Sequence, residues 1–491
     1  MSTATALSPE ILAKYQPVIG LEVHVQLLTA SKAFCGCVNQ YGGEPNTHVC
    51  PTCLGLPGAL PVLNRKAVEF AVLAAKAINC EIRETSIFSR KNYFYPDSPK
   101  GYQISQFDKP IAENGWIDVP DASGKPKRIG VTRLHMEEDA GKSVHDGFAD
   151  SVSKTYIDLN RCGTPLVEIV SEPDLRTADE VFEYLTKLKE ILLYTGVSDC
   201  NMEEGSLRCD ANVSVMLKDA KEFGTKAEVK NVNSFRYIRA AVEYEIERQI
   251  GVLEDGGRVV QESRLWNNAE GRTFSMRSKE QAHDYRYFPE PDLLPVVPAP
   301  ELIEELRAAL PEPPAARRRR LKADWGFADI DFQGVVNAGL LDEVEATIAA
   351  GATPAAARKW WLSEISRIAN AEEREPAELV SPENVAALQQ LVDAGTLTDK
   401  LARQVLEGVI AGEGTPQEVV DARGLAVVSD DGALIAAIDE ALAAQPDVLA
   451  KIRDGKVQAA GAVIGAVMKA MKGQADAARV RELVLERAAA Q

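Results

Sequence analysis

The sequence changes its pattern near residues 289–298, PEPDLLPVVP, and this change constrains the fold more than any other feature. Before this stretch, β-branched and aromatic residues alternate with turn residues in several strand-like runs, with a few helices between them. After it, alanine, leucine and glutamate dominate, and apolar residues recur with a helical period. The pattern predicts an α+β domain with a mixed or antiparallel sheet, followed by an all-α region.

The chain has 491 residues, which is too long for a single hydrophobic core. Within the helical region, a second break falls at GEGT, just before Pro416. We therefore predict three parts, which are residues 1–295, 296–410 and 411–491.

The net charge of −18 argues against nucleic-acid binding by the whole surface, but it leaves room for a local basic surface. The N-terminal residues show no basic segment followed by an apolar run, so we see no secretory signal. No stretch approaches the roughly 18 apolar residues of a membrane span. We therefore expect a cytoplasmic protein that does not bind membranes.

The segment Val18–Leu27, VIGLEVHVQL, alternates strictly between apolar and other residues, as a half-buried β-strand does. Its second face carries Glu22 and His24, whose side chains lie roughly 7 Å apart along a strand. A carboxylate beside an imidazole suits a divalent cation or acid–base chemistry. A solvent-facing strand without a role explains the alternation equally well.

Four of the eight cysteines cluster as C-x-C and C-P-x-C, twelve residues apart: Cys35, Cys37, Cys50 and Cys53. Without a signal peptide, such a cluster indicates a metal site more readily than disulfides. Two thiolate pairs can close a tetrahedron around Zn²⁺, which leaves no open position for substrate. We predict a structural zinc site inserted after the first strand, the alternative being four unligated thiols.

Three further segments place acidic or basic residues on strand-like runs. Glu137, Glu138 and Asp139 end a strand-like segment and are interpreted as metal ligands, or else as a solvated acidic turn. Glu168 lies in TPLVEIV, where a buried carboxylate must be paired, protonated or bound to a cation. Residues 207–215 alternate again, with Arg208 and Asp210 on the polar face. Together these faces suggest a cradle that suits Mg²⁺ and a nucleotide.

Helix signals occur at three points in the first part. Asn64 caps a predicted helix to residue 79, Thr177 and Glu180 form a capping box for a helix to Tyr194, and Ser234 precedes a helix to about Ile250.

Residues 91–108 gather five aromatic residues among lysines and glutamines. These aromatics can stack a base, but they can also belong to the core.

Seven motifs, taken in order, closely resemble the B-subunit family of the glutamyl/aspartyl-tRNA amidotransferases. They are IGLEVHVQL, VCPTCLGLPGALPVLN, RKNYFYPDSPKGYQISQFD, RLHMEEDAGKS, DLNRCGTPLVEIVSEPD, MEEGSLRCDANVS and DYRYFPEPDLLPV. The resemblance is dense through residue 295 and weaker in the helical part, where the tail is similar to a YqeY-like tRNA-binding module.

The resemblance implies a heterotrimer with an amidase, the A subunit, and a small third chain, the C subunit. The B subunit of such a complex uses ATP and Mg²⁺ to phosphorylate the side-chain carboxylate of Glu-tRNA(Gln) or Asp-tRNA(Asn). Ammonia released from glutamine in the amidase then displaces the phosphate. The present chain lacks a G-G-S-S amidase signature and a credible Cys–His–acid triad, which agrees with this division of labour.

Matched by motif position, the resemblance implies that His24, Glu137 and Glu168 bind Mg²⁺ and act in catalysis with Glu22. Glu22, Arg208 and Asp210 are expected to bind the nucleotide. The four cysteines match the zinc-bearing branch of the family. Proteins bind the phosphate backbone of tRNA through positively charged side chains. We therefore expect five residues of the tail to contribute: Lys456, Lys469, Lys472, Arg479 and Arg481.

Two other functions fit parts of the sequence. One is a non-catalytic, zinc-containing RNA-binding protein whose acidic cradle is only structural. The other is a free-standing metal hydrolase that acts on a small ester or phosphate without tRNA. The choice between Glu-tRNA(Gln), Asp-tRNA(Asn) or both depends on the synthetases of the cell.

Overall fold

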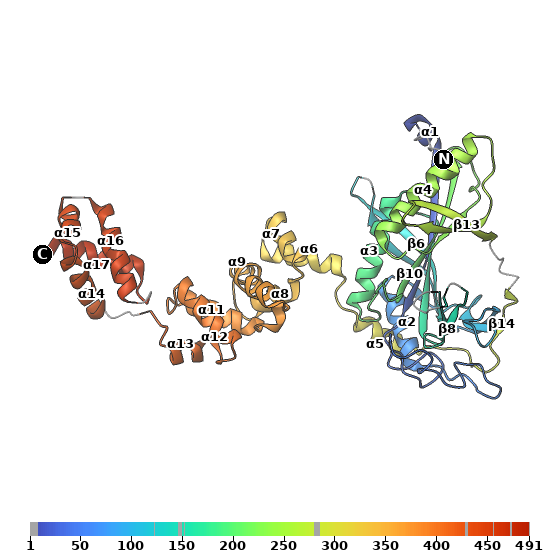
Figure 1. The fold of residues 1–491 in the computed structure, drawn as a ribbon, viewed down its shortest axis with the longest axis horizontal. Helices are drawn as coiled ribbons and strands as arrows, with labels where there is room; N and C mark the ends of the chain where they lie inside the picture. The colour runs from blue at the N-terminus through green and yellow to red at the C-terminus, as the bar shows by residue number, and fades with distance from the viewer. Residues whose placement is uncertain are drawn as a thin grey trace. The chain divides into compact units, whose positions relative to one another are not determined.

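The computed structural model describes residues 8–490 apart from residues 122, 146–149, 152, 279–284, 428–430, 455 and 472–473. The chain separates into two compact units, Met1–Ala315 and Ala316–Gln491, each of which is described by itself (Figure 1). The predicted order, a sheet domain followed by helices, is confirmed. The boundaries placed at 295/296 and 410/411 stay predictions.

The first unit is built on a nine-stranded sheet with the order β13-β12-β11-β10-β1-β9-β6-β5-β2. Neighbouring strands are antiparallel except β11 and β12, so the sheet is mixed, as predicted. The strands are β1 (Tyr15–Gln26), β2 (Glu81–Ile82), β5 (Ala112–Pro120), β6 (Pro126–Glu138), β9 (Pro165–Ser171), β10 (Leu207–Leu217), β11 (Ala227–Lys230), β12 (Glu262–Asn267) and β13 (Arg272–Ser278).

Strand β1 confirms the alternation seen in the sequence. Ile19, Leu21, Val23 and Val25 are at most 1% exposed and belong to the main hydrophobic core. Three helices supply apolar side chains to the same core: α2 (Arg65–Ala77), α3 (Ala178–Tyr194) and α4 (Phe235–Glu254). The helices therefore cover the apolar face of the sheet, and the polar face is left for other contacts.

The predicted helix starts are confirmed by the cap residues. The side chain of Asn64 accepts from the backbone N–H of Lys66, that of Thr177 accepts from Glu180, and that of Ser234 accepts from Tyr237. Each cap satisfies a backbone donor that has no partner within the helix. Helix α4 continues four residues beyond the predicted Ile250, to Glu254.

Two smaller sheets and two helices complete the first unit. The sheets are β14-β3-β4, made of β14 (Phe288–Pro289), β3 (Phe88–Asn92) and β4 (Tyr102–Gln106), and the hairpin of β7 (Lys142–Val144) with β8 (Tyr156–Asp158). The helices are α1 (Pro9–Lys14) and α5 (Pro300–Ala308). Strand β4 reaches the polar end of β6, since Gln103 Nε2 donates to the carbonyl oxygen of Glu138 at 2.7 Å.

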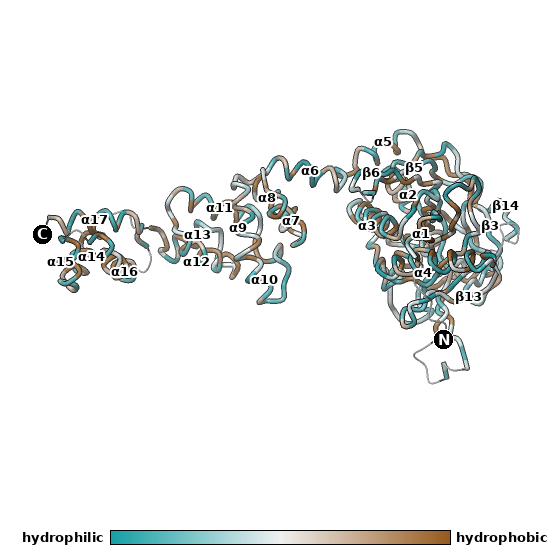
Figure 2. The backbone as a smooth tube through the Cα atoms, turned by 90° about the horizontal axis from the view of Figure 1, so that it is seen from above, coloured by the Kyte–Doolittle hydropathy of each residue, from teal (hydrophilic) through white to brown (hydrophobic). Residues whose placement is uncertain are grey.

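The second unit is helical, and Figure 2 shows hydropathy changing from residue to residue along its helices, as expected where each helix buries one face. Helix α6 (Pro314–Trp325) spans the division between the units. Residues 321–420 form one hydrophobic cluster and residues 434–488 another. The remaining elements are α7 (Asp329–Asn337), α8 (Leu341–Ala349), α9 (Pro354–Lys359), η2 (Trp360–Ile365), α10 (Ser366–Glu372), η3 (Pro376–Glu378), α11 (Pro382–Asp393), α12 (Asp399–Ile410), α13 (Pro416–Arg423), α14 (Asp431–Ala443), α15 (Pro446–Arg453), η4 (Val457–Ala459), α16 (Ala460–Ala470) and α17 (Ala477–Ala490).

Among the described residues, none of the helices combines the length and the apolar character needed to cross a membrane.

Candidate active site

The register of four adjacent strands brings the predicted site residues together. His24 on β1 lies opposite Arg208 on β10 and opposite Glu168 on β9, and Glu168 lies opposite His135 on β6. Directly paired residues point to the same face of a sheet. These side chains therefore form one row across the polar face, and Glu137 follows His135 by two positions on β6.

A potential cation site lies at the centre of this row, and we refer to His24, Glu137 and Glu168 as the carboxylate centre. His24 Nε2 lies 3.3 Å from Glu168 Oε2 and 3.4 Å from Glu137 Oε1. One ligand atom from each of the three residues lies within 4.8 Å of the other two. This spacing suits one divalent ion. Their assignment as metal ligands stays a prediction.

His135 was not predicted to be a site residue, although it stands in the motif RLHMEEDAGKS. Its Nε2 lies 3.4 Å from Glu168 Oε2 and 3.8 Å from Glu137 Oε2, and the residue is 4% exposed. The signal was its position two residues before Glu137, which places both side chains on the same face of a strand. His135 thus orients both carboxylates of the carboxylate centre.

Electrostatics at the carboxylate centre favour charged groups despite burial. Burial alone lowers the pKa of His24, but the carboxylates of Glu168 and Glu137 outweigh it and raise that pKa to about 9. Burial raises the pKa of Glu168, but His135 and His24 hold it well below its usual value. The centre therefore contains ionised carboxylates next to a protonated imidazole. A bound cation would replace the imidazole proton.

Glu138 and Asp139 have other partners, and their interpretation as metal ligands stays a prediction, whereas the alternative of a solvated turn was wrong. Both are 5% exposed. Glu138 accepts hydrogen bonds from Lys100 Nζ and, at 3.0 Å, from the backbone N–H of Ile104. Asp139 accepts from Arg208 Nη2 at 3.0 Å. The cluster of potential ligand atoms includes neither residue.

The three residues expected to bind the nucleotide lie beside the carboxylate centre on β1 and β10. Glu22 is paired in register with Asp210, and Arg208 with His24. Asn212 Nδ2 donates to Glu22 Oε1 at 2.8 Å, and Lys230 Nζ donates to Asp210 Oδ2 at 2.6 Å. Their role in nucleotide binding stays a prediction.

The aromatic residues of 91–108 form one stack among themselves and another with a second aromatic segment. Tyr93 stacks on Tyr95 with 4.4 Å between ring centroids, and Phe107 stacks on Tyr287 with 4.2 Å. Lys91 Nζ lies 4.9 Å from the ring centroid of Tyr285. Burial lowers the pKa of Lys91, but the charges of Glu137 and Tyr287 raise it by more than burial lowers it. The net pKa therefore lies above its usual value. The charge of Lys91 thus interacts with Glu137 of the carboxylate centre.

The four cysteines meet at one point, which we call the cysteine site. Cys53 Sγ lies 3.6 Å from Cys35 Sγ, 3.8 Å from Cys50 Sγ and 3.9 Å from Cys37 Sγ. Tetrahedral zinc with Zn–S bonds of about 2.3 Å requires sulfur–sulfur distances of about 3.8 Å. The four cysteines therefore can hold a metal such as zinc, with all four positions filled by protein.

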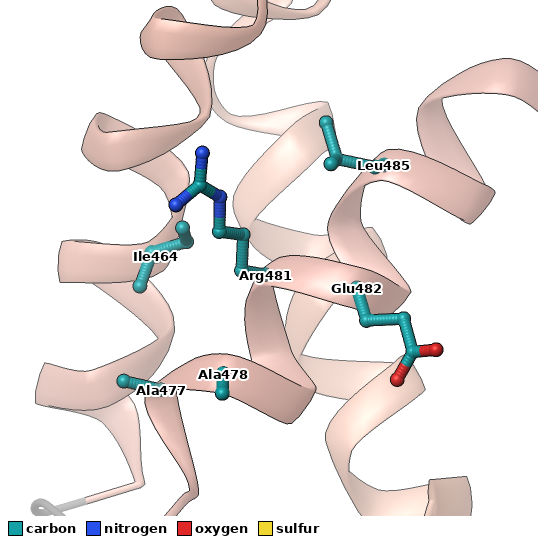
Figure 3. A pocket seen from close by; sticks show the side chains of 6 residues that line it. All are labelled: Ile464, Ala477, Ala478, Arg481, Glu482 and Leu485. Atoms are coloured by element: carbon teal, nitrogen blue, oxygen red, sulfur yellow. The ribbon is translucent and has the colours of Figure 1, made fainter.

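The C-terminal helices form an open pocket of about 630 Å³ lined by Ile464, Ala477, Ala478, Arg481, Glu482 and Leu485 (Figure 3). Figure 3 shows Arg481 extending beside Ile464. Arg479 pairs with Asp431 and Glu482, so much of its charge is neutralised locally. Lys472 lies outside the described residues. The predicted contacts of this tail with tRNA stay predictions.

Comparisons with known proteins agree with this combination of a polar-faced sheet domain and a helical region. A model described as the GatB/GatE catalytic domain matches residues 17–304, and one described as the GatB domain matches residues 342–487. The chain is therefore similar to a known class of catalytic subunits along most of its length.

Relatives over nearly the full length carry a more specific name, that of the B subunit of aspartyl/glutamyl-tRNA(Asn/Gln) amidotransferase. The relative from Leifsonia xyli subsp. xyli (strain CTCB07) is 62% identical over 485 residues, 97% of each chain. The relative from Clavibacter sepedonicus is 58% identical, with 98% of each chain covered. The chain belongs to the family of B subunits of aspartyl/glutamyl-tRNA(Asn/Gln) amidotransferases.

Proposed function

We propose that this chain activates the side-chain carboxylate of the misacylated residue on Glu-tRNA(Gln), Asp-tRNA(Asn) or both, and then converts it to the amide. The γ-phosphoryl group of ATP is transferred to a carboxylate oxygen, and ADP leaves. Ammonia attacks the carbonyl carbon of the resulting acyl phosphate, and phosphate leaves. The products, Gln-tRNA(Gln) or Asn-tRNA(Asn), serve translation, so we assign the protein to the cytoplasm.

The partners are an amidase, the A subunit, and a small third chain, the C subunit, in a heterotrimer. The amidase hydrolyses glutamine and delivers the ammonia. The relatives are named as B subunits, which agrees with an assembly of several chains. The C-terminal helices and their basic residues contact the tRNA, while its aminoacylated end reaches the sheet domain.

The observation that carries the proposal is the convergence of His24, Glu137 and Glu168 within 4.8 Å of one another. Two carboxylates and an imidazole fit a divalent cation that keeps positions for water and phosphate oxygens. Mg²⁺ held there would neutralise charge on the phosphates of ATP. Phosphoryl transfer depends mostly on such positioning and charge neutralisation, so the reaction needs few other groups.

The remaining residues of the cradle bind and orient the nucleotide. Arg208 is held at 3.0 Å by Asp139, so its guanidinium is fixed before any phosphate arrives. Glu22 and Asp210 lie beside it and are held by Asn212 and Lys230. A preorganised set of this kind avoids reorganisation during the reaction.

The test uses the purified heterotrimer with ATP, glutamine and each of the two misacylated tRNAs. The wild-type complex should amidate at least one of them, and Glu168→Gln should lose ATP-dependent amide formation while still binding tRNA. The exposed Glu204→Gln is the matched control.

Two outcomes favour the other functions. Unchanged turnover with Glu168→Gln favours a non-catalytic RNA-binding protein. Hydrolysis of a small ester or phosphate by the isolated chain, without tRNA, favours a metal hydrolase.

A further inference from the structure

The loop that carries the cysteine site touches the segment between β3 and β4 through Gly55, two residues after Cys53. Gly55 has a φ of +64°, and an added Cβ would lie 2.6 Å from Lys100 Cγ and 2.9 Å from Lys100 Cα. Side chains rarely adopt this backbone conformation, and the space is already filled, so only glycine fits. The backbone of the loop therefore rests directly on Lys100.

Lys100 is in turn a partner of the carboxylate next to the carboxylate centre. Its Nζ donates to Glu138 Oε1, and both side chains are almost fully buried. Glu138 is the last residue of β6 and follows Glu137 directly. Successive residues of a strand point to opposite faces. The Lys100–Glu138 pair thus holds β6 on one face, while Glu137 faces His24 on the opposite face.

Lys32 provides a second connection between the cysteine site and Glu138. It is 1% exposed, its Nζ donates to the carbonyl oxygen of His48 at 2.7 Å, and Nζ lies 3.6 Å from Cys53 Sγ. A Cβ placed on Gly163 would lie 3.5 Å from Lys32 Cδ and 3.8 Å from Glu138 Oε2. Lys32 and Glu138 therefore lie against the same glycine.

The charge of Lys32 fits a thiolate site. A buried ammonium is costly unless negative charge lies close to it. Four thiolates around a divalent ion keep a net negative charge, which the ammonium can balance. A single buried lysine therefore supports the cysteine site electrostatically, and its stem packs toward the end of β6.

We propose that the cysteine loop positions the carboxylate centre. With a metal on the four cysteines, Gly55 is fixed against Lys100 and Lys32 beside Cys53, and the Lys100–Glu138 pair is thereby fixed behind Glu137. Gly55 and Lys32 are positioning residues. The proposal rests on the proposed function for its activity readout and shares with it the assignment of the carboxylate centre as a cation site.

The first test compares Gly55→Ala with Gly58→Ala in the purified heterotrimer. Gly58 has a φ of +83° and nothing within 4 Å of an added Cβ, so it shares the backbone strain without the contact to Lys100. The readouts are zinc content, Mn²⁺ affinity of the carboxylate centre by electron paramagnetic resonance, and kcat and KM for ATP with ammonium as nitrogen donor.

We expect Gly55→Ala to keep its zinc but to lose about tenfold in Mn²⁺ affinity and in kcat, the size typical of groups that support metal ligands. Gly58→Ala should match the wild type in both. Equal effects of the two substitutions, or no effect of Gly55→Ala, overturn the proposal.

The second test needs no altered backbone. Stripping zinc from the wild-type complex with a chelator should lower the Mn²⁺ affinity, and returning zinc should restore it. Lys32→Met, which keeps the stem and removes the charge, should release zinc to the chelator about tenfold faster. Unchanged Mn²⁺ affinity after stripping, or unchanged release from Lys32→Met, contradicts the proposal.

These measurements distinguish failure of the proposed function from failure of the positioning role of the cysteine loop. If the wild-type heterotrimer makes no amide from either tRNA, the proposed function fails, while Mn²⁺ affinity and zinc release still decide whether the loop positions the centre.

Discussion

The cysteine site and the carboxylate centre are two clusters of potential metal ligands in one unit, built in opposite ways. The cysteines lie within residues 35–53 and are brought together by one loop. His24, Glu137 and Glu168 come from three strands and meet only because those strands pair in one register. The first cluster supplies four sulfurs and is closed to substrate, which suits a structural role. The second supplies oxygen and nitrogen ligands and is flanked by Arg208, which suits chemistry on phosphates.

The largest effect should come from Glu168→Gln. The amide keeps the shape of the side chain but removes a charge that faces His24 and His135. We expect ATP-dependent amide formation to fall by on the order of 100-fold or more, because charge neutralisation at the phosphates contributes several kcal/mol. The fall is measured as the rate of product formation on misacylated tRNA, and tRNA binding is the control. Near-normal turnover would mean that the two clusters do not differ in role.

Cys53→Ser should lower stability. Loss of one thiolate opens the tetrahedron, so bound zinc should fall well below one per chain. If this loss costs about 2 kcal/mol, the unfolding midpoint of a unit of this size drops by roughly 3 °C, since unfolding entropy is about 2.1 cal/mol/K per residue. Metal analysis and calorimetry measure both quantities. Cys162→Ser, at a buried cysteine outside the site, should keep its metal; loss of zinc from both variants would contradict a site confined to the four cysteines.

His135→Gln should have a smaller effect, confined to the carboxylate centre. The imidazole lies 3.4 Å from Glu168 and holds that carboxylate in place. Groups that orient metal ligands contribute about 10- to 100-fold to metal affinity, and we expect the lower end here. Titration with Mn²⁺ measures the affinity, and zinc content is the control. A parallel loss of zinc would show that the substitution disturbs the whole unit.

The smallest effect is a difference between the carboxylate centre and the cysteine site in the number of protons released on metal binding near pH 7.5. With its pKa raised to about 9 by Glu168 and Glu137 against the effect of burial, His24 is protonated in the metal-free centre. Cation binding should release about one proton. Affinity should therefore rise with pH and level off above about 9.

The cysteine site should release at least two protons under the same conditions. The hydrogen bond with Cys53, together with burial, raises the pKa of Cys35, and burial raises that of Cys37 to about 11. Both thiols must ionise to bind metal. Calorimetry in buffers of different ionisation enthalpy counts the protons. Equal counts at the two sites would contradict the assignment of ligands.

The same comparison explains what the sequence could predict. The cysteine spacing is local, so the four residues could be grouped without knowledge of the fold. The alternation of β1 and the caps Asn64, Thr177 and Ser234 are local signals too, and the structure confirms them. The carboxylate centre required the strand order, which alternation alone does not give. Its three members were named through resemblance to a family.

His135 and the partners of Glu138 and Asp139 could not be predicted, because they depend on long-range contacts. His135 became visible only when β6 was paired with β9. Glu138 and Asp139 were interpreted as ligands because three acids stood together, yet Lys100 and Arg208 pair with two of them. The end of a helix also escaped prediction, since α4 continues through Gly251 to Glu254 and the glycine does not end it.

The most direct test of the account is a crystal structure of the heterotrimer with Mn²⁺ and a non-hydrolysable ATP analogue, with anomalous data collected for manganese. The account predicts a manganese peak within about 2.0–2.4 Å of His24 Nε2 and of oxygens of Glu137 and Glu168, with phosphate oxygens completing the coordination. A nucleotide bound elsewhere, or a peak that one or none of these three residues touches, would contradict it.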